Sequence, residues 1–216
     1  MAKSGMIIAL DGPAAAGKGT LARKLAAHFN LAILDTGALY RAVAAKVLDQ
    51  GKSPGDGQAA VAVASSLQAS DVKHPALRSE AVTEAASLVA GNGDVRQALV
   101  QFQRDFAHHP PGNVAGALLD GRDIGTVICP DADVKLFLTA DLHARAERRF
   151  QQLRRAGQTP IKARVLEDMR SRDLRDASRA AAPLKAAPDA FELDTTGLDA
   201  DQVFARVLAH IGSKKR

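Results

Sequence analysis

Met6-Ile-Ile-Ala-Leu-Asp-Gly-Pro-Ala-Ala-Ala-Gly-Lys-Gly-Thr20 decides the fold, because in it a short apolar run meets a glycine-rich turn. Residues 6–10 are continuously apolar, which is typical of a strand buried in a parallel sheet. The turn satisfies the pattern G-x-x-x-x-G-K, and Leu21, Leu25 and Phe29 then recur at four-residue spacing, as on the apolar face of a helix. A strand, a glycine-rich turn and a helix in this order predict a phosphate-binding loop.

The predicted loop has the chemistry to hold a nucleoside triphosphate. Its glycines let backbone N–H groups turn toward phosphate oxygens, and the helix that follows adds the positive end of its dipole. Lys18 supplies a cation that can reach the terminal phosphates. The residues predicted to bind the nucleotide are Gly12, Pro13, Ala14, Ala15, Ala16, Gly17, Lys18, Gly19 and Thr20.

A second motif overlaps this loop. Gly17-x-Gly19-x-x-Ala22 also matches the dinucleotide-binding fingerprint, and Asp35 lies where a ribose-binding acid would be expected. In the dinucleotide-binding fold the first glycine directly follows the strand, whereas here six residues separate Leu10 from Gly17. We therefore reject the dinucleotide interpretation, and the lack of an Asn-Lys-x-Asp sequence argues against a GTPase.

Composition excludes several classes of protein. The chain has 216 residues, of which 46% are hydrophobic and 25% charged, so it can bury a core without disulfides, and its lone Cys129 is predicted to be inert and buried. No segment approaches eighteen consecutive apolar residues, so we expect a cytoplasmic protein with no membrane partner.

The net charge of +5 arises locally, because residues 143–185 hold twelve Lys or Arg against five Asp or Glu. Such a cluster favours a multiply charged small anion over a nucleic-acid duplex.

Further along the chain, strand and helix patterns alternate. This alternation predicts an α/β fold with a five-stranded parallel sheet flanked by helices. An inserted lobe at 58–112 carries helical, alanine-rich patterns and no convincing strand. A helix should begin at Asp141, which is an acceptable N-cap, and another should close the chain with Val203, Val207 and Ile211 on one face. The predicted strands are 6–10, 32–34, 114–119, 134–138 and 190–193.

Three more motifs follow the phosphate loop. They are Asp35-Thr-Gly-Ala-Leu-Tyr-Arg41, Asp120-Gly-Arg-Asp-Ile-Gly-Thr126 and Arg172-Asp-Leu-Arg-Asp-Ala-Ser-Arg179. Together with Gly-Lys-Gly-Thr20, they resemble the bacterial cytidylate kinases among the nucleoside monophosphate kinases, over essentially the whole chain. The resemblance implies that ATP with Mg²⁺ phosphorylates CMP and dCMP. From the charge distribution we expect no nucleic-acid partner, and since nothing in the sequence demands a dimer we expect a monomer.

The resemblance also implies a division of the chain. A P-loop core would comprise residues 1–57, 113–152 and 183–216, an insert that binds the nucleoside monophosphate would comprise 58–112, and a short closing lid would comprise 153–182. We expect the arginine-bearing part of the lid to be mobile without ligand and to order over the phosphates. In this family Mg²⁺ is bound by the nucleotide and largely by water, so we predict no protein-built metal site. Thr20 and Asp120 would contact it through water.

Cations are the catalytic groups that this reaction needs. The acceptor phosphate is already an anionic nucleophile, so no general base is required, and the obstacle is repulsion between two phosphorylated reactants. Guanidinium groups hold phosphate oxygens bidentately and stay charged. The predicted catalytic residues are Lys18, Arg122, Arg172 and Arg179.

Recognition of the base needs a carboxylate, because cytosine presents an amino donor where uracil presents a carbonyl. Asp123 is the candidate; by resemblance, Arg96 assists it, and Ser87 and Asp176 lie near the base or ribose. The predicted acceptor-binding residues are Thr36, Tyr40, Arg41, Ser87, Arg96, Arg122, Asp123, Arg172, Asp176 and Arg179.

Several of these residues have a second interpretation. Thr36 could also cap the following helix, Tyr40 could simply pack in the core, and Asp120 could brace Lys18. Surface ion pairs remain an alternative for Arg148, Arg149, Arg154 and Arg155, and His108 and His109 are predicted to lie in a loop.

Two functions also remain as alternatives: a small-molecule P-loop kinase with another acceptor, and a non-catalytic protein that binds nucleotide or RNA.

Two features depart from the family pattern. Ala14 stands where some relatives have a serine, which removes one possible phosphate contact. The insert between Gly51 and Asp94 is short and lacks a strand-like stretch that many members carry.

Overall fold

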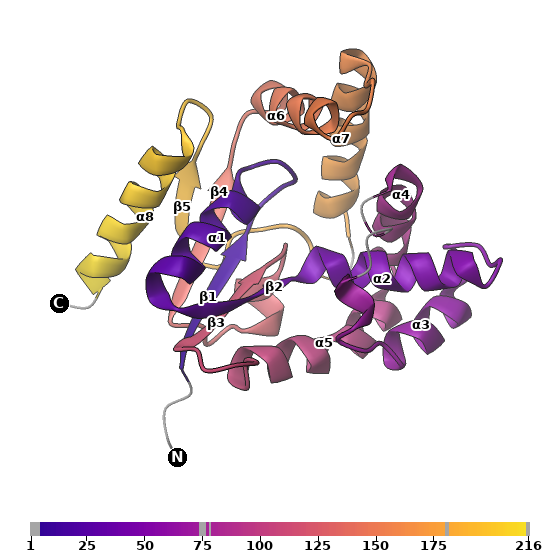
Figure 1. Cartoon of the computed structure of the whole chain (residues 1–216), viewed down its shortest axis with the longest axis horizontal. Coiled ribbons are helices and arrows are strands. Elements are labelled where there is room, and N and C mark those ends of the chain that lie inside the picture. Colours follow the sequence, from indigo (N-terminus) through magenta and orange to yellow (C-terminus); the bar gives the residue numbers. More distant parts are fainter. Residues whose placement is uncertain (1–4, 74–76, 78, 180–181, 215–216) are drawn as a thin grey trace.

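The computed structural model describes residues 5–73, 77, 79–179 and 182–214, and its centre is a parallel sheet. The five strands lie in the order β2-β3-β1-β4-β5, which confirms the predicted sheet (Figure 1). The prediction that the third strand begins at Val114 is wrong, since the strand begins at Gly116. The Ala115 N–H just before it donates to the Asn30 carbonyl (2.7 Å). The strands are β1 (Met6–Asp11), β2 (Leu31–Asp35), β3 (Gly116–Asp120), β4 (Val134–Thr139) and β5 (Phe191–Asp194).

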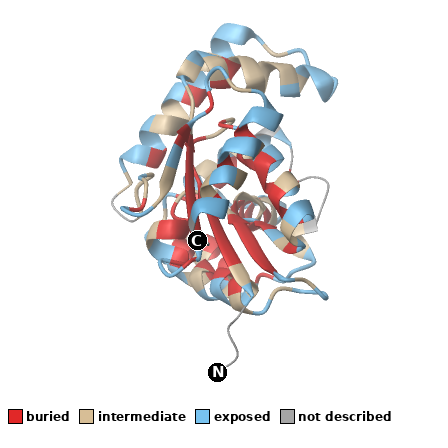
Figure 2. Ribbon diagram, turned by 90° about the vertical axis from the view of Figure 1, so that its left-hand side faces the viewer, coloured by how far each residue is buried: buried red, intermediate tan, exposed pale blue. Residues whose placement is uncertain are grey.

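Alternate residues of β1 enter two different apolar cores, as the two-residue period of a strand requires. Ile8 and Leu10 pack with residues of α1 (Lys18–Phe29) and α8 (Ala200–Lys214). Ile7 and Ala9 pack on the other face with the helices that follow β2. The three central strands β1, β3 and β4 are accordingly almost entirely buried (Figure 2). The predicted apolar face of the last helix is confirmed, since Val203, Val207 and Ile211 are buried.

Residues 58–112, the predicted insert, are helical as expected, and none of the described residues among them forms a strand. Helix α2 packs against α4, and α3 against α5. The interpretation of His108 as a loop residue is wrong, because α5 ends at His108 and His109 is its C-cap. The helices on this side of the sheet are α2 (Thr36–Asp49), α3 (Gly57–Ser65), the 3₁₀ turn η1 (Asp71–Lys73), α4 (Glu80–Val89) and α5 (Gly93–His108).

Helices α6 (Leu142–Arg155) and α7 (Lys162–Ala177) pack against each other at the edge of the molecule (Figure 1). The predicted start at Asp141 is confirmed, because its carboxylate accepts the His143 and Ala144 N–H groups. This pair has a small apolar cluster of its own, centred on Ala146, against which Ala14 of the phosphate loop packs. The helix pair is thus in contact with the loop.

Two further sequence features can be placed. Cys129 is buried, as predicted, and burial raises the pKa of its thiol to about 11. Lys214 is the last residue of α8, and residues 215–216, where a solvated Lys-Arg tail would be expected from the sequence, lie outside the described residues. In the described parts of the chain, none of the helices combines the length and apolarity needed to cross a membrane.

Candidate active site

Carboxylates gather at one edge of the sheet, because parallel strands all end on the same side. Asp11, Asp35 and Asp120 are the last residues of β1, β2 and β3. The register places Asp35 beside Asp120, with Asp120 also opposite Leu10 of the central strand. The segments that follow β1, β2 and β3 carry three of the sequence motifs, so the fold brings these three together. The fourth motif, at residues 172–179, begins on α7.

The phosphate loop leaves β1 through a position that only glycine can occupy. Gly12 has φ +141°, and a Cβ there would lie 2.1 Å from the Leu138 carbonyl oxygen. Gly17 has φ +97°, and Ala15 also adopts a left-handed conformation, with φ 58°, which is uncommon for a residue other than glycine. The Lys18 ammonium donates to the Gly12 (2.8 Å) and Pro13 (3.0 Å) carbonyls, and so crosses back over the loop.

Burial and neighbouring charges weaken the proton affinity of Lys18. The side chain is only 7% exposed, and burial together with Arg122 lowers its pKa to about 8, although Asp120 and Asp11 oppose the shift. Asp120 Oδ1 lies 3.7 Å from Lys18 Nζ, which supports the bracing role. Asp120 also lies beside the first turn of α1, since a Cβ on Gly19 would be 3.8 Å from Oδ2. The geometry therefore suits both interpretations of Asp120.

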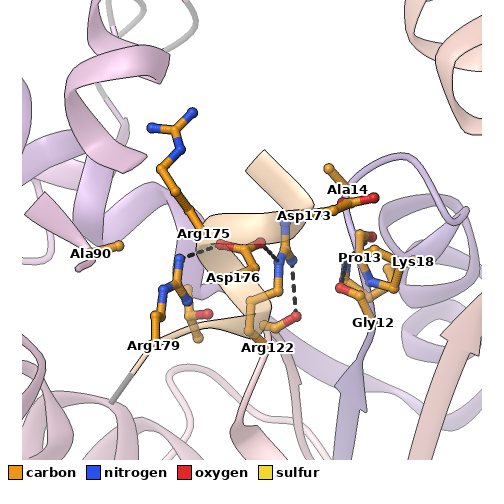
Figure 3. Close-up of polar contacts among 12 residues, drawn as sticks. Gly12, Pro13, Ala14, Lys18, Ala90, Arg122, Asp173, Arg175, Asp176 and Arg179 are labelled. Atoms are coloured by element: carbon orange, nitrogen blue, oxygen red, sulfur yellow. Dashed lines mark hydrogen bonds and ion pairs between the residues drawn. The ribbon is translucent and has the colours of Figure 1, made fainter. Parts of the chain in front are cut away.

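Asp176 of α7 gathers two of the predicted arginines (Figure 3). Its carboxylate is 1% exposed and accepts from Arg122 Nε (3.1 Å) and from Arg179 Nη2. Burial alone would raise the pKa of Asp176, but Arg122 and Arg179 hold it below its ordinary value. Arg172 forms no ion pair within the described chain, and burial and repulsion from Arg122 lower its pKa to about 10. The site thus concentrates more positive charge than its own carboxylates neutralise.

A cavity of about 140 Å³ lies on the insert side of these arginines. Asp123, Arg96 and Tyr40 all line it, as do residues that follow Asp123 in the chain. Arg96 Nη2 pairs with Asp123 Oδ2, Nη1 donates to the Ala90 carbonyl (3.3 Å), and the guanidinium lies 5.4 Å from the Tyr40 ring centroid. Tyr40 is buried, so it both packs in the core and faces the cavity, where it meets the predicted base-binding pair.

The other residues predicted to bind the acceptor nucleotide have different kinds of contacts. The prediction that Thr36 caps a helix is wrong: Asp35 is the N-cap, and the Thr36 hydroxyl donates to the Asp120 carbonyl (2.9 Å). Arg41 Nη2 pairs with Asp35 Oδ2 (2.7 Å). Arg41 Nε and Ser87 Oγ are buried without a hydrogen-bond partner among the described residues, whereas buried polar groups normally have one. Neither Arg41 nor Ser87 is among the residues that line the cavity.

Two arginines of α6, near the phosphate loop, have contacts that the sequence did not reveal. Arg145 of α6 binds Asp173 of α7 with both terminal nitrogens (3.1 and 2.6 Å) and the Ala14 carbonyl (3.4 Å), so it ties the phosphate loop to the helix that carries the arginines. Arg148 binds Thr195 rather than a carboxylate, so the surface ion pair is wrong for this residue. The sequence offered no spacing or motif that marks either residue.

The residues around the loop fit a triphosphate that brings its own Mg²⁺. The backbone at Gly12 leaves no room for a side chain, Lys18 lies across the loop, and Asp120 lies beside Gly19. The Thr20 hydroxyl is in the exposed first turn of α1, where it accepts from Arg23 Nη2 (3.3 Å). Both oxygen-bearing groups expected near Mg²⁺ are therefore on the loop side of the site.

Comparison with known proteins gives consistent results. The family model described as cytidylate kinase matches residues 8–213. The cytidylate kinase of Methylocella silvestris is 58% identical over 208 residues, 96% of this chain and 94% of the relative, and that of Paramagnetospirillum magneticum is 54% identical, over 97% and 99%. A solved structure of an uncharacterized protein from Eubacterium ventriosum is similar in fold, with a TM-score of 0.55 at 15% identity over 96% of this chain and 99% of that one.

Proposed function

Since this chain belongs to the cytidylate kinase family, we propose that it transfers the γ-phosphoryl group of ATP to CMP and dCMP, giving CDP and dCDP. Its fold is that of the P-loop nucleoside monophosphate kinases. The observation that carries the proposal is the convergence of Lys18, Arg122 and Arg172 beside a cavity lined by Arg96 and Asp123. Positive charge thus lies next to a pocket suited to a base with an amino group.

On the acceptor side, Asp123 accepts a hydrogen bond from the amino group of cytosine and repels the carbonyl of uracil. Arg96 fixes that carboxylate and has donors left for the acceptor atoms of the base. Arg41 and Arg122 hold the acceptor phosphate, for which the unpartnered Arg41 Nε is available. Ser87, whose buried hydroxyl also has no hydrogen-bond partner among the described residues, binds the nucleoside.

On the donor side, Lys18 and the loop hold the triphosphate, and Arg145 keeps α7 close to the loop. Mg²⁺ supplies additional positive charge to the phosphates when bound, and Thr20 and Asp120 would hold it through water. An acceptor phosphate oxygen forms a bond to the γ-phosphorus as the bond to the β-phosphate oxygen breaks, and ADP leaves. No proton needs to be removed from the acceptor, which is why the site requires cations and no general base.

The division into core (1–57, 113–152, 183–216), insert (58–112) and lid (153–182) is part of the proposal. We expect the lid to close over both nucleotides, because an open site would pass the phosphoryl group to water. Addition of ATP and CMP together should slow amide hydrogen exchange in α7 and leave α8, on the far side of the sheet, unchanged. Equal exchange in α7 with and without both nucleotides would contradict closure.

The pKa of Lys18 predicts how ATP binding depends on pH. Because this pKa is lowered to about 8, the ligand-free protein loses the Lys18 charge as the pH rises through that value. A bound triphosphate favours the ammonium form, so ATP binding at about pH 8.5 should take up a proton, and ATP affinity should fall between about pH 7 and about pH 9. Calorimetry in buffers of different ionisation enthalpy measures the uptake. The variant Lys18→Met should show none, and equal uptake in both proteins would contradict this role.

One assay tests the function directly. Release of ADP should be measured with CMP, dCMP, UMP and AMP at equal concentrations, with Mg²⁺ present. We expect turnover with CMP and dCMP above that with UMP and AMP. Preference for another acceptor would support the alternative kinase, and no turnover with any of them would contradict the proposal.

We also propose that the protein acts as a monomer in the cytoplasm, with these nucleotides as its partners.

A further inference from the structure

The chain directly after Asp123 adopts an uncommon conformation. Residues Ile124–Ile128 form η3, a single turn of π-helix, in which Ile128 N–H donates to the Asp123 carbonyl (3.3 Å) and Cys129 N–H to the Ile124 carbonyl (2.7 Å). Such turns are rare and often occur at functional sites. Asp123 is the N-cap of η3, and Val127 and Ile128 line the same cavity as Asp123. The conformation of η3 therefore sets the direction of the Asp123 carboxylate.

Asp11 holds the first end of this turn. Its Oδ1 accepts the Ile124 N–H (2.9 Å) and its Oδ2 accepts the Gly125 N–H (2.8 Å). Asp11 continues the alternation of Ile7 and Ala9 on β1, which places it on the face of the sheet where Ile124 is buried. The side chain is 4% exposed, and burial raises its pKa to about 7 although the two N–H groups oppose that shift.

Arg104 holds the other end. Its Nε donates to the Ile128 carbonyl (3.0 Å) and its Nη2 donates to the Val127 carbonyl (3.0 Å). Arg104 lies on α5, the helix that also carries Arg96, the partner of Asp123. A carboxylate at the N–H end and a guanidinium at the carbonyl end are each the charge that a helical turn favours there.

We propose that Asp11 and Arg104 are positioning residues for recognition of the acceptor base: they hold η3 at both ends and so fix the Asp123 carboxylate against Arg96. This proposal rests on the proposed function. Asp11 immediately precedes Gly12, the first residue of the phosphate loop, so one strand end bears both the donor site and the support of the base-reading carboxylate. The two substrates are thereby placed relative to each other through β1.

The chain provides a matched control for Asp11. Asp133 Oδ2 accepts the Ile7 N–H (2.8 Å), which is the same kind of bond, from a carboxylate to a backbone N–H, at the opposite end of β1. Asp133→Asn therefore removes the charge of a comparable contact far from the site, and its amide oxygen can still accept the single N–H. For Arg104, Arg104→Met keeps most of the side-chain length without any donor, and Arg104→Lys restores a donor and the charge.

The experiment compares KM for CMP, KM for ATP and the ratio of kcat/KM for CMP over UMP. Asp11→Asn keeps the side-chain volume but turns an amide donor toward a buried N–H group, so KM for CMP should rise about tenfold and the CMP-to-UMP ratio should fall about tenfold. KM for ATP should change by less than about twofold. Arg104→Met should shift the first two quantities in the same direction, Arg104→Lys should recover most of the loss, and Asp133→Asn should resemble the parent protein.

Amide hydrogen exchange provides a readout that does not depend on catalysis. Exchange at residues 124–129 should accelerate in Asp11→Asn and Arg104→Met and stay unchanged in Asp133→Asn. Folded variants that retain the parent KM for CMP and the parent CMP-to-UMP ratio would overturn the proposal. If Asp11→Asn does not fold, Arg104→Met decides the outcome. A parent protein that phosphorylates no CMP would refute the proposed function, and exchange at residues 124–129 would then decide whether Asp11 and Arg104 support η3.

Discussion

Replacing Lys18 by methionine should lower kcat for CDP formation by about 10³-fold, because it removes a preorganised cation from the transferring phosphates. Methionine retains the length and packing of the buried side chain, so the loss should reflect charge rather than a collapsed loop. Steady-state kinetics with ATP and CMP measure the change, and thermal unfolding verifies that the variant is folded.

Lys24 is the matched control for Lys18. It lies on the same helix, but pairs with the exposed Asp201 at the surface. Lys24→Met should keep kcat within about twofold, because such surface pairs contribute little. Equal activities of Lys18→Met and Lys24→Met would remove the basis for assigning Lys18 to phosphoryl transfer.

Replacing Asp123 by asparagine should lower kcat/KM for CMP by about 100-fold and abolish the preference for CMP over UMP. The asparagine oxygen can still accept from Arg96, but the neutral amide can orient toward either base. Alanine would be a poorer test, because it would leave the Arg96 guanidinium buried without its partner. The value of kcat/KM should be measured for CMP and for UMP at saturating ATP, and the two values compared.

Asp71 provides the corresponding control. It pairs with Lys46 of α2, neither residue lines the cavity, and this contact holds the pKa of its carboxyl below the ordinary value. Asp71→Asn should leave the CMP-to-UMP ratio unchanged. A ratio that also stays unchanged in Asp123→Asn would show that another group reads the base.

The parts of the fold predictable from sequence are those encoded by local pattern. Apolar runs such as residues 6–10 predict strands because burial on both faces requires them, and the parallel order then brings the ends Asp11, Asp35 and Asp120 to one edge. The arginines of the third motif lie on and just after α7 and not at a strand end, so their place near the phosphates was expected only from the family resemblance and from the need for cations. Their arrangement around Asp176 depends on packing between α7 and the loop that contains Arg122, which no local pattern encodes.

Several of the mistaken or missing predictions involve hydrogen bonds between residues distant in the sequence. Thr36 had the right chemistry for a helix cap, but the Asp120 carbonyl, 84 positions away, competes for its hydroxyl. Asp11 bonds Ile124 across 113 positions, and Arg145 bonds the Ala14 carbonyl across 131. The sequence does show that Asp11 is a carboxylate at the end of an otherwise apolar strand, which is a reason to examine it. It does not show which groups Asp11 binds, because the N–H groups belong to an unusual π-turn.

The central claim is that a cluster of cations brings two mutually repelling nucleotides together for direct transfer between them. The most direct measurement is phosphorus NMR of the protein with ATP, CMP and Mg²⁺, which follows each product separately. The account predicts that CDP and ADP appear at equal rates and that inorganic phosphate does not accumulate. ADP formed together with inorganic phosphate in place of CDP would contradict it.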